Sequence, residues 1–382
     1  MEKKTKPKTI TVGALNEAVG VEYRVAITPE SASRLLKFGV QAYVEPSAGL
    51  KAGWTDADYE KAGAVLAPRE DILKKSSAIA YIAAPTSETI YSQSKGSYAV
   101  GMFNSLANKT ISDQFASAGV IAFDIYLLPR KLSKTQSMDA MTSQAAVAGY
   151  KAVILAANEF CSFLPMMTTA AGTIKPASVL ILGAGIAGLQ AIGTARRLGA
   201  VVTAYDVRPA AKEEVLSLGA KFLDLAAYGG PDLSEGQGAG GYARELTPEE
   251  KTAQQAAVDK AAANFDIIIA TAQVPGRRPP VLLTKQGLDG LKRGSVVVDV
   301  AASALGGNIE GSLADTTIPL PSGVKIVGAG NLAADIPRAA SNLLSRNISD
   351  VLLHFVSESG QIEFKADDEL AGLAIGAVSN NE

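Results

Sequence analysis

Val179-Leu-Ile-Leu-Gly-Ala-Gly-Ile-Ala-Gly188 is the stretch of this sequence that decides its fold. Four apolar residues lead directly into the glycine positions 183, 185 and 188, and a helical pattern then runs to Leu198. A short apolar strand that passes through a glycine-rich turn into a helix begins a parallel β–α–β unit. The sequence therefore predicts an α/β fold, with a candidate dinucleotide site at this turn.

The residues that follow the helix strengthen this prediction. Gly199 ends the helix, residues 201–205 read as the next strand, and Asp206 closes that strand. In such a turn the first glycine permits the bend, the second lets the backbone approach a pyrophosphate and the third lets helix and strand pack. The carboxylate would bind the ribose hydroxyls of NAD and repel a 2′-phosphate. The predicted cofactor residues are Gly183, Gly185, Gly188 and Asp206, and the alternative is a glycine-rich turn that binds nothing.

Composition limits the possible function classes. The 382 residues are 47% hydrophobic and 19% charged, and the net charge of −2 gives no indication of nucleic-acid binding. Cys161 and His354 are the only cysteine and histidine, so we expect neither an intrachain disulfide nor a cysteine or paired-histidine metal site. No apolar run reaches the ~18 residues that span a bilayer, and the basic start lacks a signal-peptide core. We expect a cytoplasmic protein that reaches a membrane only through a partner.

Short apolar runs alternate with helical patterns along the chain, which predicts two Rossmann-like, doubly wound lobes with parallel sheets. The strands expected in the first lobe lie at 9–14, 41–44, 78–83, 98–103 and 120–125, with helices at 30–38 and 111–118. The strands expected in the second lobe lie at 179–182, 201–205, 221–223, 266–271, 295–300 and 324–327.

Two long helical patterns, at 139–163 and 332–351, are expected to join the lobes. The second returns the chain to the first lobe, so we predict a discontinuous N-terminal domain of residues 1–145 and 330–382. The NAD-binding domain would then be residues 146–329. The glycine-rich connection 226–250 is long enough to be a mobile lid over a bound nucleotide. Residues 371–382 are expected to carry no regular structure.

A cluster of polar side chains follows the last expected strand of the first lobe. Arg130, Gln136, Asp139 and Thr142 bring a guanidinium, an amide, a carboxylate and a hydroxyl to the carboxyl edge of that sheet. Ligands bind at this edge in open α/β folds. These groups can orient a nicotinamide and its ribose, yet none is an obvious proton shuttle. The alternative is a loop that leads into a helix, with Ser137 or Asp139 as the capping residue.

Several further stretches carry a resemblance to a known family. They are Arg24-Val-Ala-Ile-Thr-Pro29, Pro129-Arg-Lys-Leu-Ser-Lys-Thr-Gln-Ser-Met-Asp139, Ala148-Gly-Tyr-Lys-Ala-Val153, Pro165-Met-Met-Thr-Thr-Ala-Ala-Gly-Thr173, Tyr205-Asp-Val-Arg208, Gly240-Gly-Tyr-Ala243 and Val324-Lys-Ile-Val-Gly328. With the glycine turn, they make the chain resemble domain I of proton-translocating NAD(P) transhydrogenase, the component that binds NAD(H). The first and last stretches are shared with alanine dehydrogenase, a relative of the same fold. The second stretch and the Gly-Gly-Tyr sequence favour transhydrogenase.

The resemblance also implies roles for individual residues. The implied catalytic residues, around the nicotinamide and on the mobile loop, are Arg130, Gln136, Asp139, Thr142 and Tyr242. Among these, Gln136 would also project towards NADP on a partner domain. The implied cofactor residues, besides the three glycines and Asp206, are Ile186, Ala187, Val207, Arg208, Gly241, Thr271, Ala272 and Gln273.

The implied activity is hydride transfer between NADH and NADP⁺ bound on a partner domain, of the Si-specific/Re-specific proton-translocating type. A membrane subunit would couple this transfer to proton translocation. Direct transfer between two nicotinamides releases no proton at the site, which fits a cluster without a shuttle. Alanine dehydrogenase uses a lysine and a histidine, and residues 77–85 and 102–105 contain neither. His354 is interpreted as a packed or surface residue.

The resemblance implies partners as well. It predicts membrane-spanning and NADP-binding transhydrogenase subunits or domains, a homodimer, and a peripheral location on the inner face of a membrane. Two alternatives stay open at this point. One is an amino-acid dehydrogenase similar to alanine dehydrogenase, and the other is a non-enzymatic regulator that binds NAD.

Overall fold

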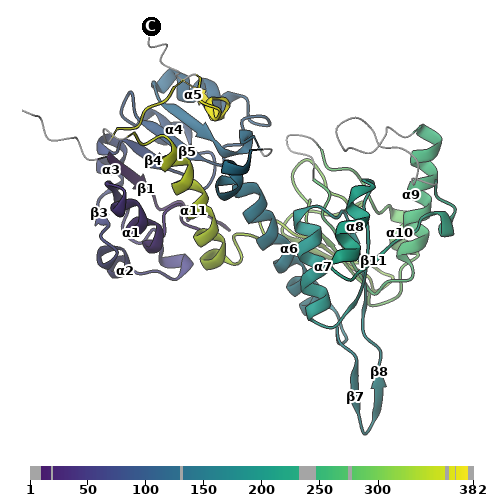
Figure 1. The fold of residues 1–382 in the computed structure, drawn as a ribbon. Helices are drawn as coiled ribbons and strands as arrows, with labels where there is room; N and C mark the ends of the chain where they lie inside the picture. Colours follow the sequence, from purple (N-terminus) through teal and green to yellow (C-terminus); the bar gives the residue numbers. More distant parts are fainter. Residues whose placement is uncertain are drawn as a thin grey trace, which may run out of the picture. The chain divides into compact units, whose positions relative to one another are not determined.

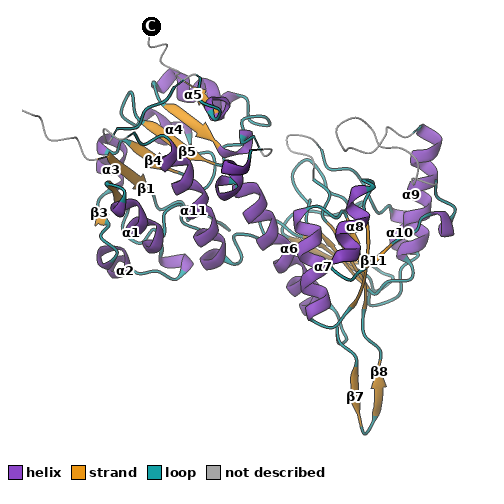
Figure 2. Cartoon of the chain, in the orientation of Figure 1, coloured by secondary structure: helices purple, strands orange, loops and turns teal. Residues whose placement is uncertain are grey.

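The computed structural model describes residues 10–18, 20–129, 132–231, 247–273, 278–357, 361–365 and 367–376 (Figure 1). The chain divides into two compact units, one of Met1–Gln144 with Ala333–Glu382 and one of Ala145–Leu332. Each unit contains a seven-stranded sheet with helices around it (Figure 2). The predicted α/β class with two parallel-dominated sheets is confirmed.

The first unit is built on a doubly wound sheet with the strand order β16-β6-β5-β4-β1-β2-β3. Its strands are β1 (Ile10–Ala14), β2 (Val40–Val44), β3 (Val65–Leu66), β4 (Ala78–Ala80), β5 (Tyr98–Gly101), β6 (Ile121–Asp124) and β16 (Ala374–Gly376). The first six pair in parallel, and the order reverses between β1 and β4. Ligands bind at such a reversal in open α/β sheets, outside the carboxyl ends of the strands.

Strand β16 corrects one expectation from the sequence. Residues 374–376 were expected to have no regular structure, but they pair antiparallel with β6, and Leu373 before them is fully buried. The tail forms a strand because it covers the otherwise open edge of β6, which leaves fewer backbone groups unpaired. This pairing joins positions about 250 residues apart, so no local pattern announces it.

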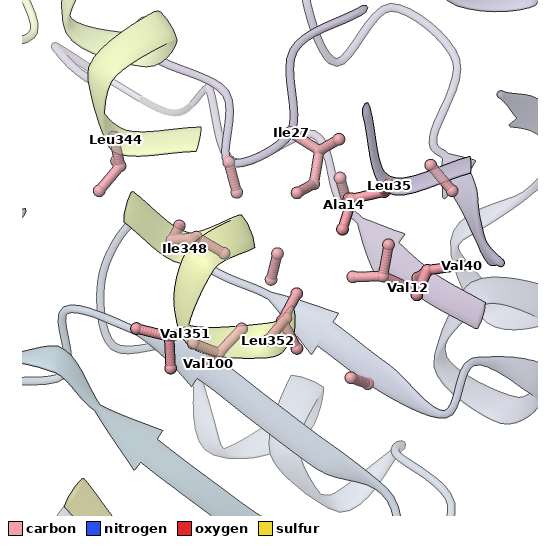
Figure 3. Close-up of a cluster of buried hydrophobic side chains, with 14 of the residues drawn as sticks. Val12, Ala14, Ile27, Leu35, Val40, Val100, Leu344, Ile348, Val351 and Leu352 are labelled. Carbon is pink, nitrogen blue, oxygen red and sulfur yellow. The ribbon is translucent and has the colours of Figure 1, made fainter. Parts of the chain in front are cut away.

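Helices cover both faces of this sheet. They are α1 (Pro29–Lys37), α2 (Asp56–Lys61), α3 (Arg69–Lys75), α4 (Ser87–Tyr91), α5 (Thr110–Ala118) and α11 (Pro337–His354), with the 3₁₀ helices η1 (Leu50–Ala52), η2 (Ile125–Leu127), η3 (Ser133–Met138) and η6 (Ala371–Leu373). Helix α11 buries Leu344, Ile348, Val351 and Leu352 in one cluster with residues of β1, β2 and β5 (Figure 3). Their i, i+4, i+7, i+8 spacing places them on one helical face.

Helix α11 begins at Pro337, five residues later than the pattern predicted. Proline occupies the first turn, and the preceding Ile336 has φ −125° and ψ 61°, outside the helical region. Proline disfavours helical geometry in the residue before it, so the apolar residues from 332 onward form a turn instead. The helix therefore lies wholly within the first unit, and the chain re-enters that unit before the helix starts.

The second unit repeats the doubly wound design with the order β11-β10-β9-β12-β13-β15-β14. Its strands are β9 (Ser178–Leu182), β10 (Val201–Tyr205), β11 (Lys221–Phe222), β12 (Ile267–Ala270), β13 (Val296–Asp299), β15 (Lys325–Gly328) and the antiparallel edge strand β14 (Thr316–Pro319). Its helices are α7 (Ile186–Arg197), α8 (Ala210–Ser217), η4 (Ala226–Tyr228), α9 (Pro248–Ala262) and α10 (Lys285–Asp289). The six strands expected from the sequence are all present.

Helix α6 (Ala140–Glu159) carries the chain from the first unit into the second, with the division between Gln144 and Ala145. It begins close to the predicted start and ends four residues before the predicted end. Its mid-helix glycine has a structural reason, because a Cβ at Gly149 would lie 2.1 Å from the carbonyl oxygen of Ala187. Gly149 thus lets α6 lie directly against the start of α7, at the glycine turn.

A two-stranded hairpin, β7 (Met167–Thr169) with β8 (Gly172–Ile174), was not expected from the sequence. It extends away from the sheet of the second unit, and every residue of both strands is exposed (Figure 1). Apolar side chains on the hairpin and its stem are exposed by 37% to 63%: Phe163, Met166, Met167 and Ile174.

Candidate dinucleotide-binding site

The glycine turn lies at the carboxyl end of β9, where the strand order of the second sheet reverses between β9 and β12. Gly183 has φ +96°, in the left-handed region that glycine adopts without strain. Its N–H donates to Tyr205 O (2.8 Å), and its carbonyl accepts from Thr271 Oγ1 (2.9 Å). Strands β9, β10 and β12 therefore hold the turn together at the position where a ligand would bind.

The other two glycines meet opposite environments. A Cβ at Gly188 would lie 1.9 Å from the carbonyl oxygen of Gly183, so only glycine lets α7 pack this closely on the turn. A Cβ at Gly185 would meet no atom within 4 Å. Gly188 is thus required by the protein itself. Gly185 faces open space, as expected of a residue that a pyrophosphate approaches.

The start of α7 is a candidate anion site. Gly185 is its N-cap residue and supplies no side-chain hydrogen bond to the first turn. The positive end of a twelve-residue helix therefore faces the space beside Gly185. Ile186 and Ala187, predicted at the pyrophosphate, form this first turn, and the Ile186 side chain is 44% exposed.

Asp206 supports the turn through its own carboxylate. Oδ2 accepts from Ala184 N (2.8 Å), and Oδ1 accepts from Arg208 N (2.8 Å) and Arg208 Nε (3.0 Å). The Arg208 guanidinium also donates to Ala184 O (3.1 Å). The carboxylate at the predicted ribose position therefore also links the glycine turn to the end of β10. Val207, between these two residues, is exposed.

The predicted residues after β12 lie beside the same turn. Besides the bond from Thr271 to Gly183, the amide of Gln273 donates to Val300 O (3.0 Å). Ala272 O accepts from the buried Asn308 Nδ2 (2.8 Å). The structure therefore brings the ends of β9, β12 and β13 together around the three predicted residues.

Sequence reasoning missed two buried supports of this region. Asn308 also donates to Pro280 O (2.7 Å), and Asp299 accepts from the N–H groups of Ala301 and Ile309 and from the Ser312 hydroxyl. Together they shape the segment that follows β13. The sequence signal that could have found Asp299 is its place at the end of an apolar strand, which it shares with Asp206. These three hydrogen bonds of Asp299 all go to the segment that follows its own strand.

The predicted nicotinamide group is only partly described. Asp139 Oδ1 accepts from Thr142 N (2.9 Å), and Oδ2 accepts from Thr142 Oγ1 (2.6 Å). Asp139 therefore caps α6, which is one of the two sequence interpretations. Gln136 lies on η3, three residues before Asp139, with an exposed side chain. Arg130 lies outside the described residues.

The predicted lid is likewise mostly outside the described residues, which stop at 231 and resume at 247. Gly241 and Tyr242 fall in this interval. At its two ends, residues 226–228 form η4, and α9 begins with a capping box between Thr247 and Glu250.

A second polar cluster lies at the carboxyl edge of the first sheet. Both carboxylate oxygens of Glu17 accept from Ile82 N (3.0 and 3.1 Å), which ends β4 earlier than predicted. Burial raises the pKa of Glu17 to about 8, against the lowering effect of this backbone bond. Arg24 pairs with Glu22 (2.6 Å) and donates to Gln144 Oε1 (2.8 Å) on α6.

The single histidine belongs to neither cluster. His354 Nε2 lies 3.0 Å from both carboxylate oxygens of Asp368, and its ring meets Phe355 edge-on. Burial opposes the ionisation of Asp368, but the bonds from Leu370 N and His354 outweigh it, so the pKa of Asp368 is lowered. This packing agrees with the sequence interpretation of His354 as a structural residue.

The helices and the candidate metal ligands of the described residues bear on whether this part of the chain could span a membrane or hold a metal ion. None of its helices is long and apolar enough to cross a membrane. Within the same residues, no group of three or more histidine, cysteine, aspartate or glutamate side chains is arranged to hold a metal ion.

Two doubly wound sheets and a glycine turn at a switch point define a two-unit protein of the Rossmann dinucleotide-binding class. Family models match almost the whole chain: the alanine dehydrogenase/PNT N-terminal domain covers residues 13–148 and the C-terminal domain covers residues 152–379. The chain belongs to this family, and within it to the homologues of the NAD(P) transhydrogenase alpha subunit.

Individual relatives agree with this assignment. The chain is 39% identical over 364 residues to an NAD(P) transhydrogenase subunit alpha chain of Rickettsia prowazekii, covering 94% of this chain and 92% of that protein. The crystal structure of transhydrogenase from Sinorhizobium meliloti superposes with a TM-score of 0.79 at 41% identity, covering 91% of this chain and 94% of that chain. Alanine dehydrogenase 1 of Staphylococcus aureus is more distant, at 26% identity over 94% of this chain and 91% of that protein.

Proposed function

We propose that this chain is the NAD(H)-binding component of a proton-translocating transhydrogenase. It would pass a hydride between its own nicotinamide and NADP on a partner domain, with the Si-specific/Re-specific stereochemistry of that type. The observation that carries the proposal is the glycine turn, where the start of α7 faces open space at Gly185 beside the Asp206 carboxylate. The identity of 39% to a transhydrogenase alpha chain and of 41% to a solved transhydrogenase supports this activity over the others of the fold.

The proposed binding roles follow from these contacts. The pyrophosphate would lie against Gly185 and the N–H groups of Ile186 and Ala187, where the helix dipole favours an anion. Asp206 would accept from the ribose hydroxyls, flanked by Val207 and Arg208. The adenosine would lie near residues 271–273, which line the same turn. Gly241 and Tyr242 are proposed to close over the bound nucleotide.

Selectivity for NAD over NADP is part of the proposal. The Arg208 guanidinium neutralises some of the Asp206 charge, so simple repulsion of a 2′-phosphate is weakened. A carboxylate whose oxygens already accept from N–H groups can still accept from ribose hydroxyls, but it offers no donor to a phosphate. We expect NADH to bind at least tenfold more tightly than NADPH in parallel titrations. Equal affinities would remove Asp206 from this role.

The nicotinamide end is assigned to Arg130, Gln136, Asp139 and Thr142 on the strength of the resemblance. Because Asp139 and Thr142 already bond to each other, their proposed contribution is a fixed pair of oxygen atoms rather than freely moving groups. Gln136 has an exposed side chain and is proposed to reach the second nicotinamide. No proton shuttle is needed, because the hydride passes directly between two nicotinamide rings.

The decisive experiment mixes this chain with an NADP-binding transhydrogenase domain and follows hydride transfer in a stopped-flow instrument. Transfer that requires both proteins is expected. Gln136→Asn should slow it about a hundredfold while NADH affinity stays within twofold, because a displacement of ~1 Å between reacting groups costs about that much. The same preparation is assayed for oxidation of L-alanine with NAD⁺. Alanine turnover would favour the dehydrogenase alternative, and NADH binding without either activity would favour the regulator.

The proposed partners are a membrane-spanning subunit that couples transfer to proton translocation, an NADP-binding subunit, and a second copy of this chain. The location would be peripheral, on the inner face of a membrane. The exposed apolar residues of the β7–β8 hairpin support the homodimer, because a two-stranded hairpin is marginally stable alone. In sedimentation measurements, Ile174→Lys should weaken the dimer, whereas Thr173→Lys on the neighbouring position serves as a matched charge control.

A further inference from the structure

Asn347 of α11 connects two segments that carry the proposed nicotinamide residues. Its Nδ2 donates to the carbonyl oxygen of Ser137 (2.7 Å), and its Oδ1 accepts from Ser143 Oγ (2.7 Å). Ser137 follows Gln136 directly on η3, and Ser143 follows Thr142 directly on α6. The Asn347 side chain is buried, with 7% exposure. One side chain on a helix more than 200 residues away thus bonds beside two proposed functional residues.

The chemistry of the two partners determines which way the amide faces. A backbone carbonyl oxygen can only accept, so the nitrogen of Asn347 must face Ser137. The oxygen is then left for the Ser143 hydroxyl, which can donate. A carboxylate at neutral pH has no donor for Ser137 O, and the single oxygen of a hydroxyl cannot occupy both the donor and the acceptor position. The position therefore specifies asparagine.

Other side chains of η3 also contact the rest of the unit: Met138 is buried in the hydrophobic cluster with α11, and Lys134 forms an exposed ion pair with Glu369 (2.6 Å). The buried Thr135 hydroxyl bonds to Pro129 O (2.9 Å) and Leu132 O (2.7 Å), which sets the local shape of the turn. These partners lie within six residues, so they do not fix the turn against the rest of the unit. Among the described residues, the bond from the buried Asn347 is the side-chain hydrogen bond that joins η3 to α11.

We infer that Asn347 is a positioning residue for hydride transfer, one that holds η3, and with it Gln136, in register with the start of α6. The inference rests on the proposed function, because Gln136 must reach the second nicotinamide for its position to matter. Asn347 itself is not proposed to contact either nucleotide. Its removal should change where Gln136 lies while leaving the Asp139–Thr142 cap in place.

The principal test is Asn347→Asp in the full-length chain reconstituted with the NADP-binding domain. A carboxylate would face the Ser137 carbonyl oxygen, so η3 should move. Hydride transfer should slow at least tenfold, NADH affinity should stay within twofold, and amides 133–139 should lose protection from hydrogen exchange. Because a protonated carboxyl can donate to Ser137 O, the ratio of variant to wild-type rate should rise as the pH is lowered. Protonation would also relieve a general loss of stability, so the unchanged NADH affinity and the exchange confined to residues 133–139 are what distinguish the positioning role.

Two further variants keep the test decisive. Ser345→Ala is the matched control, since Ser345 Oγ is equally buried on α11 and accepts from Thr28 N (3.0 Å), away from η3. It should reduce stability without changing the rate or the exchange at 133–139. Asn347→Leu adds no charge and replaces Asn347→Asp if that variant does not fold, with the same slowing expected.

The outcomes separate this inference from the proposed function. Wild-type transfer with unchanged exchange in Asn347→Asp or Asn347→Leu overturns the inference, provided that Gln136→Asn is slow. Equal slowing in Ser345→Ala overturns it as well, because the effect would then follow stability. If Gln136→Asn transfers hydride at the wild-type rate, the proposed role of Gln136 fails. Slowing in the Asn347 variants could not then arise through Gln136, so this result also overturns the inference.

Discussion

Gly185 and Gly188 lie in the same turn, but an added methyl group should have opposite consequences at the two positions. At Gly188 the new Cβ would lie 1.9 Å from Gly183 O, far inside contact distance, and the obstacle is backbone that cannot rotate away. At Gly185 the Cβ would meet nothing within 4 Å, and the backbone (φ −75°, ψ −168°) suits any residue. One substitution should therefore damage the fold and the other should damage binding.

The magnitudes follow from these distances. Overpacking at Gly188→Ala should cost about 1–3 kcal/mol, which lowers Tm by about 2–12 °C for a unit of this size. Gly185→Ala loses only a favourable N-cap residue, at less than about 1 kcal/mol. Its methyl group would occupy the space of the pyrophosphate. Losing two charge-assisted hydrogen bonds there, at about 1.5 kcal/mol each, weakens NADH binding about a hundredfold.

Thermal unfolding followed by circular dichroism and NADH titration by calorimetry measure the two effects separately. Gly193→Ala is the matched control, because a Cβ there meets only the end of Arg197 at 3.5 Å on the same helix. It should retain NADH affinity and gain about 0.5–1 kcal/mol of stability from the higher helix propensity of alanine.

Two results would refute this reasoning. Wild-type NADH affinity in Gly185→Ala would mean that no pyrophosphate approaches that residue. A wild-type Tm in Gly188→Ala would mean that the turn and α7 are not in the close contact described.

Three further predictions concern carboxylates. Burial raises the pKa of Glu17 from 4.5 to about 8, so the folded state keeps a proton that the unfolded state releases. The free energy of unfolding should therefore fall as the pH rises from about 4.5 to about 8, by at most about 5 kcal/mol. In urea unfolding at several pH values, Glu17→Gln should remove this part of the pH dependence. Asp139→Ala should lose the cap of α6 and about 0.5–2 kcal/mol of stability, whereas Thr142→Val, which keeps the backbone bond, should lose less in the same thermal unfolding measurement. Burial opposes ionisation of Asp266, but the hydrogen bonds from Ser178 and Lys292 outweigh it and lower the pKa of Asp266. The stabilisation that ionised Asp266 gives the fold is present above the ordinary pKa of aspartate and is lost as the pH falls through the lowered pKa. Calorimetry should therefore find Asp266→Asn destabilising at pH 7 and nearly neutral at low pH.

Local patterns were sufficient for much of this protein. Five of the six strands predicted in the second unit are short apolar runs that a parallel sheet buries on both faces, whereas the edge strand β11 is two residues long with Lys221 exposed. The glycine turn was readable because steric requirements on a backbone are local, and Gly183 and Gly188 meet them at their predicted places. The strand–turn–helix order then implied a switch point, and with it the edge of the sheet where a ligand would bind.

Partners distant in the sequence decided the rest. Asp206 carries a predicted function, and only the folded chain shows that its carboxylate also holds Ala184 N, 22 residues away. The strand β16 exists because β6 presents an open edge, and the hairpin β7–β8 has no signal stronger than a few threonines and a glycine.

Asn347 illustrates the same division. In the sequence it is one polar residue in an otherwise ordinary helical pattern, and nothing nearby suggests that it differs from Ser345 or Ser349. Its importance depends on two hydrogen bonds, to positions 210 and 204 residues away. Sequence determines which residues can form strands, turns and helices, because those preferences act over a few residues. Which polar groups meet is decided by tertiary structure, since burial obliges each of them to find a partner wherever the fold places one.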